Sequence, residues 1–198
     1  MKIGFNVYDW KDIMKVCGSV AETYEERIML TYIKIDCDNG RFTAYGSNGF
    51  QLSRLCGRCE MDDNCPVSFL LPVMKTPPKT AKVEIMPKVE VLGGKTVLYF
   101  YDKNGNVTAT TDVEIPDGEY IDAADFFKRA EDGINLYNHG QGSYMVAVNP
   151  RYLMNALEGM KGCESVILNF ASPVEAFMIR PYKEDLEATA LVYPVRIR

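Results

Sequence analysis

Hydrophobic residues recur at helical spacing in three segments of the chain, and this pattern predicts helices at 9–21, 123–132 and 150–161. Each segment begins at or just after a polar residue that can cap the first amides of a helix: Asp9, Asp122 and Asn149. Pro150 suits the first position of the third helix, where its missing amide proton is no loss. We expect Gly133 to end the second helix, whose apolar face consists of Ala123, Phe126, Phe127 and Ala130.

Shorter apolar runs, several of them alternating with polar residues, predict strands. The predicted strands cover 28–36, 41–47, 50–55, 67–74, 82–92, 96–101, 107–115, 144–148, 165–170, 175–180 and 187–197. Asp38-Asn39-Gly40 is a hairpin signal between the first two, because Asn and Gly tolerate the positive φ of a tight turn. Strands that outnumber the helices and follow one another as hairpins indicate an antiparallel α+β fold.

The segment Pro116-Asp117-Gly118-Glu119-Tyr120 combines turn-forming residues between two patterned regions and is the predicted domain boundary. It divides the 198 residues into a module at 1–118 and a shorter module at 119–198. The two modules have a loosely similar order of elements, since helices are followed by antiparallel strands in both halves.

Composition narrows the class of protein. A hydrophobic content of 47% is ordinary for a globular protein, and no apolar run approaches the roughly 20 residues of a membrane helix. The N-terminus has no signal-peptide pattern, so we expect a cytoplasmic protein without a membrane partner. The net charge of −5 argues against loose coating of nucleic acid, although a locally basic surface can exist on an acidic protein.

Four cysteines leave a metal hypothesis open. Cys56 and Cys59 have the spacing of a zinc-binding pair, and Cys65 and Cys37 could complete a tetrahedral set. Structural zinc sites usually have two such pairs, and this region has one. Reduced free thiols without a metal or other cofactor are therefore the preferred interpretation.

The sequence contains little that indicates catalysis. The single histidine, His139, lies in a Gly-rich loop without an obvious partner, and Gly93-Gly94-Lys95 lacks the spaced glycine and the hydroxyl of a phosphate-binding loop. We therefore expect a protein that is not an enzyme.

Three motifs, in order along the chain, resemble those of one family. They are Ala44-Tyr-Gly-Ser-Asn-Gly-Phe-Gln-Leu52, Asn149-Pro150-x-Tyr152-Leu153 and the terminal Tyr193-Pro194-Val195-Arg196-Ile197. Together they resemble the middle and final modules of the bacterial sliding clamp, the processivity (beta) subunit of replicative DNA polymerase. The chain departs from the family pattern at Asn48, Gln51 and Tyr193, where Asp, Arg and Met are usual.

The resemblance implies a fold of clamp-like modules, each an antiparallel sheet with helices on one face, and a function as a DNA sliding clamp. It implies a hydrophobic pocket that binds peptides of DNA polymerase and the clamp loader, lined by Leu30, Ser47, Gly49, Leu52, Tyr193, Pro194 and Val195. It also implies nonspecific contacts to duplex DNA through basic helix faces, with Lys11, Lys15, Lys128, Arg129, Arg151 and Lys161 as candidates. Encirclement of DNA requires a closed homo-oligomer.

Two plainer interpretations remain beside the resemblance. The apolar pocket residues could be ordinary core, and the basic residues could belong to solvated helix faces, since acids stand next to them. A different class of function is also open, namely a small α+β protein-interaction domain, zinc-bound through the four cysteines, with no role on DNA.

Overall fold

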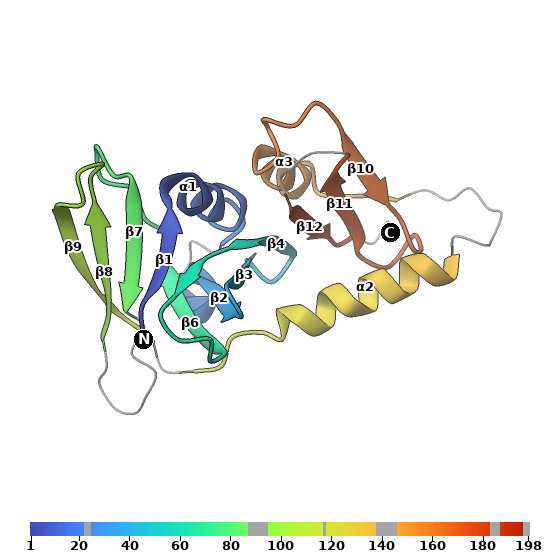
Figure 1. Cartoon of the computed structure of the whole chain (residues 1–198). Coiled ribbons are helices and arrows are strands. Elements are labelled where there is room, and N and C mark those ends of the chain that lie inside the picture. Colours follow the sequence, from blue (N-terminus) through green and yellow to red (C-terminus); the bar gives the residue numbers. More distant parts are fainter. Residues whose placement is uncertain (22–24, 87–94, 117, 138–145, 183–186, 196–198) are drawn as a thin grey trace.

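The computed structural model describes residues 1–21, 25–86, 95–116, 118–137, 146–182 and 187–195. In these ranges the chain forms two antiparallel sheets and three α-helices (Figure 1), which confirms the predicted α+β class. None of the helices in these ranges is long and apolar enough to cross a bilayer.

The first sheet is built entirely from the N-terminal half of the chain. Its order is β5-β1-β7-β8-β9, and its strands are Glu60–Met61, Ile3–Asn6, Lys82–Met86, Lys95–Tyr101 and Val107–Glu114. The hairpin of β8 and β9 was predicted from the sequence. β1 and β5 were not, because segments of four and two residues are too short to show a period.

The second sheet joins the two halves of the chain. Its order is β10-β11-β12-β4-β3-β2-β6, and its strands are Val166–Asn169, Phe177–Pro181, Ala188–Val192, Gln51–Arg58, Arg41–Ser47, Tyr32–Asp38 and Val67–Pro72. The join is the antiparallel pair β4–β12, in which Leu52 lies opposite Leu191. Backbone hydrogen bonds therefore cross the predicted boundary at residue 118, and the division into two modules remains a prediction.

Helix α1 (Val7–Val16) begins earlier and ends earlier than predicted. Its N-cap is Asn6 and not Asp9, because the Asn6 Oδ1 accepts hydrogen bonds from the amides of Tyr8 and Asp9, both at 2.9 Å. Trp10 and Ile13 on its apolar face are fully buried.

The other helices confirm their predicted caps but not their predicted ends. In α3 (Pro150–Glu158) the Asn149 Oδ1 accepts from the amide of Arg151 at 2.9 Å, and the helix stops at Glu158 and not at residue 161. In α2 (Ala123–Tyr137) the Asp122 Oδ1 accepts from the amide of Asp125 at 3.0 Å. Gly133 does not end α2, because one glycine costs a helix only about 1 kcal/mol.

Three predicted strands differ most from the structure. Residues 28–31 belong to a 3₁₀ segment, Glu25–Thr31, and the strand starts only at Tyr32. β12 ends at Val192, before the proline at 194 whose missing N–H cannot extend a ladder. No strand forms at 146–148, although Ala147 accepts a hydrogen bond from the amide of Val195 at 2.8 Å; residues 144–145 lie outside the described ranges.

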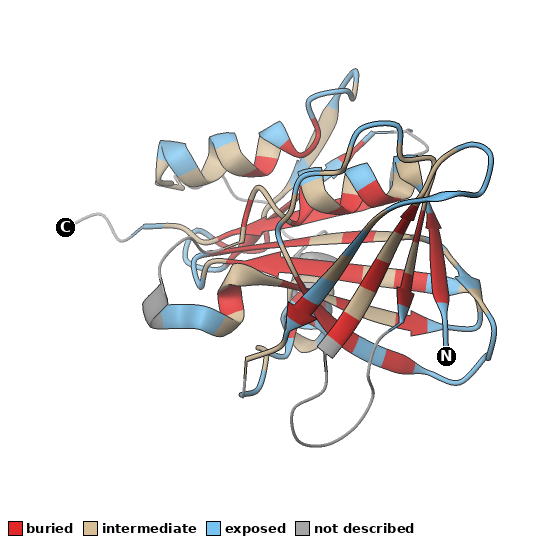
Figure 2. Cartoon of the chain, turned by 90° about the vertical axis from the view of Figure 1, so that its left-hand side faces the viewer, coloured by how far each residue is buried: buried red, intermediate tan, exposed pale blue. Residues whose placement is uncertain are grey.

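The helices cover opposite faces of the seven-stranded sheet. Side chains alternate along a strand, so Phe177 and Ile179 of β11 face one way and Met178 faces the other. Phe177 and Ile179 pack in the main core with α1 and α3, whereas Met178 packs in a smaller core with Phe127 of α2. Buried residues accordingly run along the central strands, with exposed helix surfaces outside them (Figure 2). α1 and α3 thus share a face, as expected, and α2 departs from that arrangement.

Candidate functional site

The junction of β4 and β12 brings the terminal strand beside the bend at residues 47–52. Gln51 lies opposite Val192, and Leu52 lies opposite Leu191. The tail strand therefore lies next to the bend, as a pocket lined by residues of both segments requires, and this contact creates the edge of the candidate site.

The bend itself is shaped by its own hydrogen bonds. Asn48 Oδ1 accepts from the amides of Phe50 and Gln51, at 3.0 and 2.8 Å, and Ser47 Oγ donates to the Gln51 carbonyl at 2.9 Å. Gly49 adopts a φ of +81°, and a Cβ there would lie 2.5 Å from Arg27 Nη1. A side chain at this position would meet a backbone penalty from the positive φ, and the Arg27 guanidinium would have to move aside.

A groove with two adjoining compartments lies between this bend and helix α2. The first compartment, about 380 Å³, is mainly apolar and is lined by Ser47, Gly49, Phe50, Gln51, Leu52, Ile121, Phe126 and Tyr193. The second, about 300 Å³, is lined by Phe126, Arg129, Ala130, Ala171, Val174, Glu175, Ala176 and Tyr193. Because Phe126 and Tyr193 line both, these two aromatic side chains separate the compartments.

Helix α2 forms one wall of the groove because its first turns are anchored to the sheet. Phe127 is fully buried, and the Arg54 guanidinium lies 4.5 Å from the centre of its ring. Arg54 also forms an ion pair with Glu131 at 2.7 Å. The neighbouring Phe126, which is 37% exposed, is thereby held in the groove.

Gln51 is the notable polar residue of the groove. Its side chain is 1% exposed, and its Oε1 accepts from Asn48 Nδ2 at 3.3 Å. Its Nε2 has no hydrogen-bond partner among the described residues. A buried amide donor without a partner costs about 1–3 kcal/mol, and a ligand that accepts from it would recover part of this cost.

An aromatic stack forms the rim on the side of α3. Phe50 stacks on Tyr152 with ring centres 5.6 Å apart and planes at 9°, and the Arg27 guanidinium lies 5.3 Å from the centre of the Phe50 ring. At the other wall, Arg129 forms an ion pair with Asp125 that lowers the pKa of the Asp125 carboxyl. Burial raises the pKa of the Tyr193 hydroxyl, so this groove residue is neutral at physiological pH.

Four of the seven predicted pocket residues line the groove: Ser47, Gly49, Leu52 and Tyr193. Leu30 is buried behind the bend, its Cδ1 lying 3.7 Å from where a Cβ of Gly49 would be. Pro194 and Val195 follow the end of β12 and do not line either compartment, and Val195 is 45% exposed.

Several lining residues are absent from the predicted pocket, above all Phe50, Gln51, Ile121 and Phe126. Helical spacing predicts Phe126 on the buried face of its helix, and this is the signal that the sequence offers. Its role as a groove wall depends on which surface α2 packs against, and helical spacing alone does not determine that surface.

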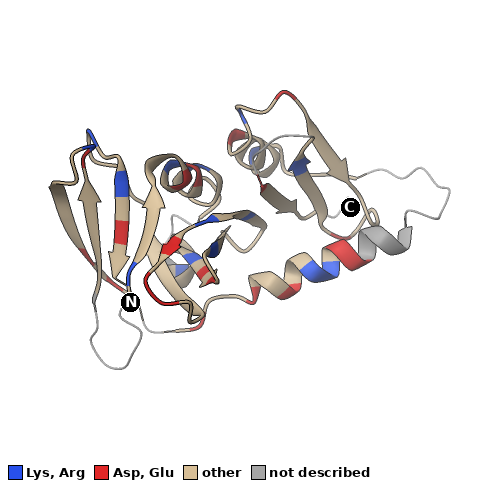
Figure 3. Ribbon diagram, in the orientation of Figure 1, with Lys and Arg blue, Asp and Glu red and all other residues tan. Residues whose placement is uncertain are grey.

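The predicted DNA-binding residues divide between two faces of the molecule. Lys11 and Lys15 are exposed on α1, Arg151 is exposed on α3, and Lys161 follows α3. These four residues lie on or next to α1 and α3, on the main-core side of the sheet, where side chains of both charges occur (Figure 3). Lys161 forms an ion pair with Glu158 at 3.3 Å.

The remaining two candidates, Lys128 and Arg129, lie on α2, which packs against the opposite face of the sheet. Arg129 lines the second compartment of the groove. One surface cannot contain all six basic residues.

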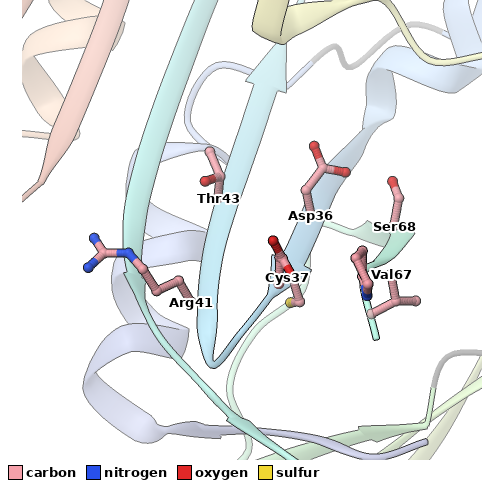
Figure 4. Close-up of a pocket in the computed structure, with 8 residues that line it drawn as sticks. Asp36, Cys37, Arg41, Thr43, Val67 and Ser68 are labelled. Carbon is pink, nitrogen blue, oxygen red and sulfur yellow. The ribbon is translucent and has the colours of Figure 1, made fainter. Parts of the chain in front are cut away.

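A second hollow of about 520 Å³ lies at the β2–β3 hairpin (Figure 4). Asp36, Cys37, Arg41, Thr43, Val67 and Ser68 are among its lining residues. It is open and contains charges of both signs, and it does not adjoin the groove.

The structure does not bring the four candidate zinc ligands together. Cys37 and Cys59 are neighbours, since the Cys37 thiol donates a hydrogen bond that lowers the pKa of Cys59. Cys37 lies opposite Phe42 in the sheet, and Phe42 lies opposite Gly57, so these three residues share one face of the sheet. Cys56 precedes Gly57 on β4, and side chains alternate along a strand. The Cys56 side chain therefore points to the other face of the sheet, away from Cys37. Among the described residues no three His, Cys, Asp or Glu side chains form a group that could hold a metal, so the zinc hypothesis was wrong. His139 lies outside the described ranges.

The fold is that of the bacterial sliding clamps, the class of protein that the sequence motifs resemble. The DNA polymerase III beta chain of Streptococcus pneumoniae superposes with a TM-score of 0.73 at 16% identity, covering 100% of this chain and 65% of that one. This chain is also similar to the DNA polymerase III beta subunit of Thermotoga maritima, with a TM-score of 0.71 at 14% identity, covering 100% of this chain and 66% of that one. It is similar to the sliding clamp of Bacillus subtilis with a TM-score of 0.70 at 15% identity, covering 100% of this chain and 65% of that one.

These likenesses show the fold, because the identities are low. The chain spans about two thirds (65%) of the length of the S. pneumoniae protein. No family model matches the sequence, and no curated protein matches it.

Proposed function

We propose that this protein is a clamp-like processivity factor that is not an enzyme, binds duplex DNA and captures partner peptides in the groove between β4, β12 and α2. One observation carries the proposal: on a sliding-clamp fold, an apolar groove contains Ser47, Gly49, Leu52 and Tyr193, the positions that the family motifs assign to a peptide pocket.

The groove has the chemistry of a site for an extended peptide with hydrophobic anchors. Its two compartments, on either side of Phe126 and Tyr193, have room for two apolar side chains of one peptide. The unpartnered Nε2 of Gln51 would donate a hydrogen bond to a carbonyl of the bound segment. The expected partners are DNA polymerase and the clamp loader.

The α1–α3 face is the proposed surface for DNA. Lys11, Lys15 and Arg151 are exposed there and would contact phosphates without reading bases, which allows movement along the duplex. Encirclement would require a closed homo-oligomer, and two modules per chain would require three copies for a ring of six modules.

Peptide capture is tested by screening short overlapping peptides of the host's replicative polymerase and clamp loader against the purified chain. The peptide that binds best is then labelled and titrated by fluorescence anisotropy. Absence of any peptide that binds with micromolar or better affinity would refute peptide capture.

DNA binding is tested by replacing Lys11, Lys15 and Arg151 with Glu. We expect weaker retention of duplex DNA and a salt-dependence slope that falls by about 1 for each phosphate contact removed. Lys128→Glu is the matched control, because Lys128 is exposed on α2 at the other face of the sheet. Equal effects of the triple variant and the control would exclude the α1–α3 face as the DNA surface.

A further inference from the structure

Two cysteine side chains meet where the β2–β3 hairpin adjoins the end of β4. Cys37 lies on β2, opposite Phe42, and Cys59 comes directly after β4. The Cys59 amide donates a hydrogen bond to the carbonyl of Gly40, in the turn of the hairpin, at 2.9 Å, and this bond holds Cys59 beside the hairpin. The Cys37 thiol donates a hydrogen bond to the Cys59 sulfur, and neither cysteine is in a disulfide.

The two sulfurs differ in their access to solvent. Cys37 is 2% exposed and belongs to the main core. Cys59 is partly exposed and packs against that core from its edge. A small solute can therefore reach Cys59, and the Cys37 thiol lies behind it, already in contact with the sulfur that the solute meets.

The hydrogen bond makes Cys59 the nucleophilic member of the pair. It lowers the pKa of the Cys59 thiol, whereas the same bond together with burial raises the pKa of Cys37. A hydrogen bond to Asp63 raises the pKa of the exposed Cys65. Because the thiolate is the form that reacts with oxidants, Cys59 is favoured over Cys65 although Cys65 is the more exposed.

We propose that Cys59 and Cys37 are a modification site for small hydroperoxides, which convert the two thiols into a reversible disulfide. The Cys59 thiolate attacks one peroxide oxygen, the O–O bond breaks and hydroxide leaves, so that Cys59 becomes a sulfenic acid. The Cys37 sulfur then attacks the Cys59 sulfur. The S–S bond forms as the S–O bond breaks, and the departing hydroxide takes the Cys37 proton and leaves as water.

The reaction balances with hydrogen peroxide as the oxidant. The hydroxide released in the first step recombines with the proton that the Cys59 thiol had lost. Two thiols and one hydrogen peroxide therefore give one disulfide and two waters. The two sulfurs together lose two electrons, and the two peroxide oxygens gain them.

The buried partner is what makes the oxidation reversible. A sulfenic acid that meets no thiol is oxidised further to a sulfinic acid, which thiols do not reduce, whereas a disulfide is reduced by thiol exchange. Because Cys37 already contacts Cys59, the second step requires the two sulfurs to approach from hydrogen-bond contact to a bond of about 2.05 Å.

This inference does not rest on the proposed peptide binding. Cys59 follows the last residue of β4, whereas the groove contains Gln51 and Leu52 at the first residues of that strand. Oxidation and peptide capture are thus tested at opposite ends of one strand, and either proposal can fail without the other.

The experiment is oxidation of the full, reduced chain with hydrogen peroxide, followed by thiol blocking and tryptic mapping without reductant. Cleavage after Lys and Arg releases Cys37 in peptide 35–41, Cys56 in peptide 55–58, and Cys59 together with Cys65 in peptide 59–75. We expect a cross-linked species that joins 35–41 to 59–75 and that dithiothreitol separates. The loss of free thiols should be two of the six in the chain.

Cys65→Ser is the matched control, since Cys65 is exposed and shares its tryptic peptide with Cys59. It should leave the cross-link unchanged. In Cys37→Ser the sulfenic acid should persist, so that dimedone labels Cys59 about fivefold more than in the wild-type chain. In Cys59→Ser the buried Cys37 should stay reduced.

The wild-type chain alone can overturn the proposal, without any variant that has to fold. Oxidation of Cys65 before the cross-link forms would do so, as would conversion of Cys59 to a sulfinic acid while Cys37 stays reduced. Loss of the cross-link in Cys65→Ser would also overturn it, because the disulfide would then involve Cys65.

Discussion

Replacement of Phe126 by Ala is the sharpest test of the groove. Phe126 lines both compartments, and 37% of its surface is exposed. The helix that presents it is held by Ala123 and Phe127, which are fully buried and remain in place in the variant. The substitution therefore removes a wall of the groove without removing the anchors of α2.

The size of the effect follows from the exposed area of the ring. A phenylalanine has an accessible surface of roughly 200 Å², so the exposed 37% of Phe126 is about 75 Å². Covering this area with a bound peptide stabilises the complex by about 2 kcal/mol, which is about 30-fold in the dissociation constant. We expect this loss in an anisotropy titration with the labelled peptide. Urea unfolding should show a smaller change, because the side chain is partly exposed in the free protein.

Met154→Ala is the matched control, since Met154 is 62% exposed on α3 and lines neither compartment. It should leave peptide affinity unchanged. If Phe126→Ala changes affinity less than about threefold while hydrogen exchange shows α2 still protected, the assignment of the groove as the peptide site is refuted.

Two further predictions concern Gln51 and the cysteines. Gln51→Met removes the buried amide while keeping the volume of the side chain. Peptide affinity should therefore fall about five- to tenfold, and the free energy of unfolding should change by less than about 1 kcal/mol. Unchanged affinity would exclude a hydrogen bond from Gln51 to the ligand. The hydrogen bond from Cys37 lowers the pKa of the Cys59 thiol, whereas Asp63 raises the pKa of Cys65. Because the thiolate is the reactive form, the pH midpoint of iodoacetamide labelling, followed by mass spectrometry, should be lower for Cys59 than for Cys65. Cys37→Ala should raise the Cys59 midpoint, and an unchanged midpoint would contradict the assigned cause.

Local chemistry in the sequence determined much of the fold. The cap at Asn149, the hairpin turn at Asn39-Gly40 and the meander strands follow from side chains that act on their own backbone or alternate along it. That the terminal strand and the bend at Leu52 line one pocket was implied only by the family resemblance of the three motifs, since apolar periodicity alone would have left these residues as ordinary core.

The tertiary structure decided which surfaces meet. Helical spacing shows that α2 has a buried face, but only the packed sheet places Phe126 in the groove and separates Lys128 from Lys11. Likewise, a Cys spacing suited to zinc did not reveal that Cys56 faces away from Cys37. A sequence period reports which side of an element avoids water, whereas the partner of that side depends on contacts between residues far apart in the chain.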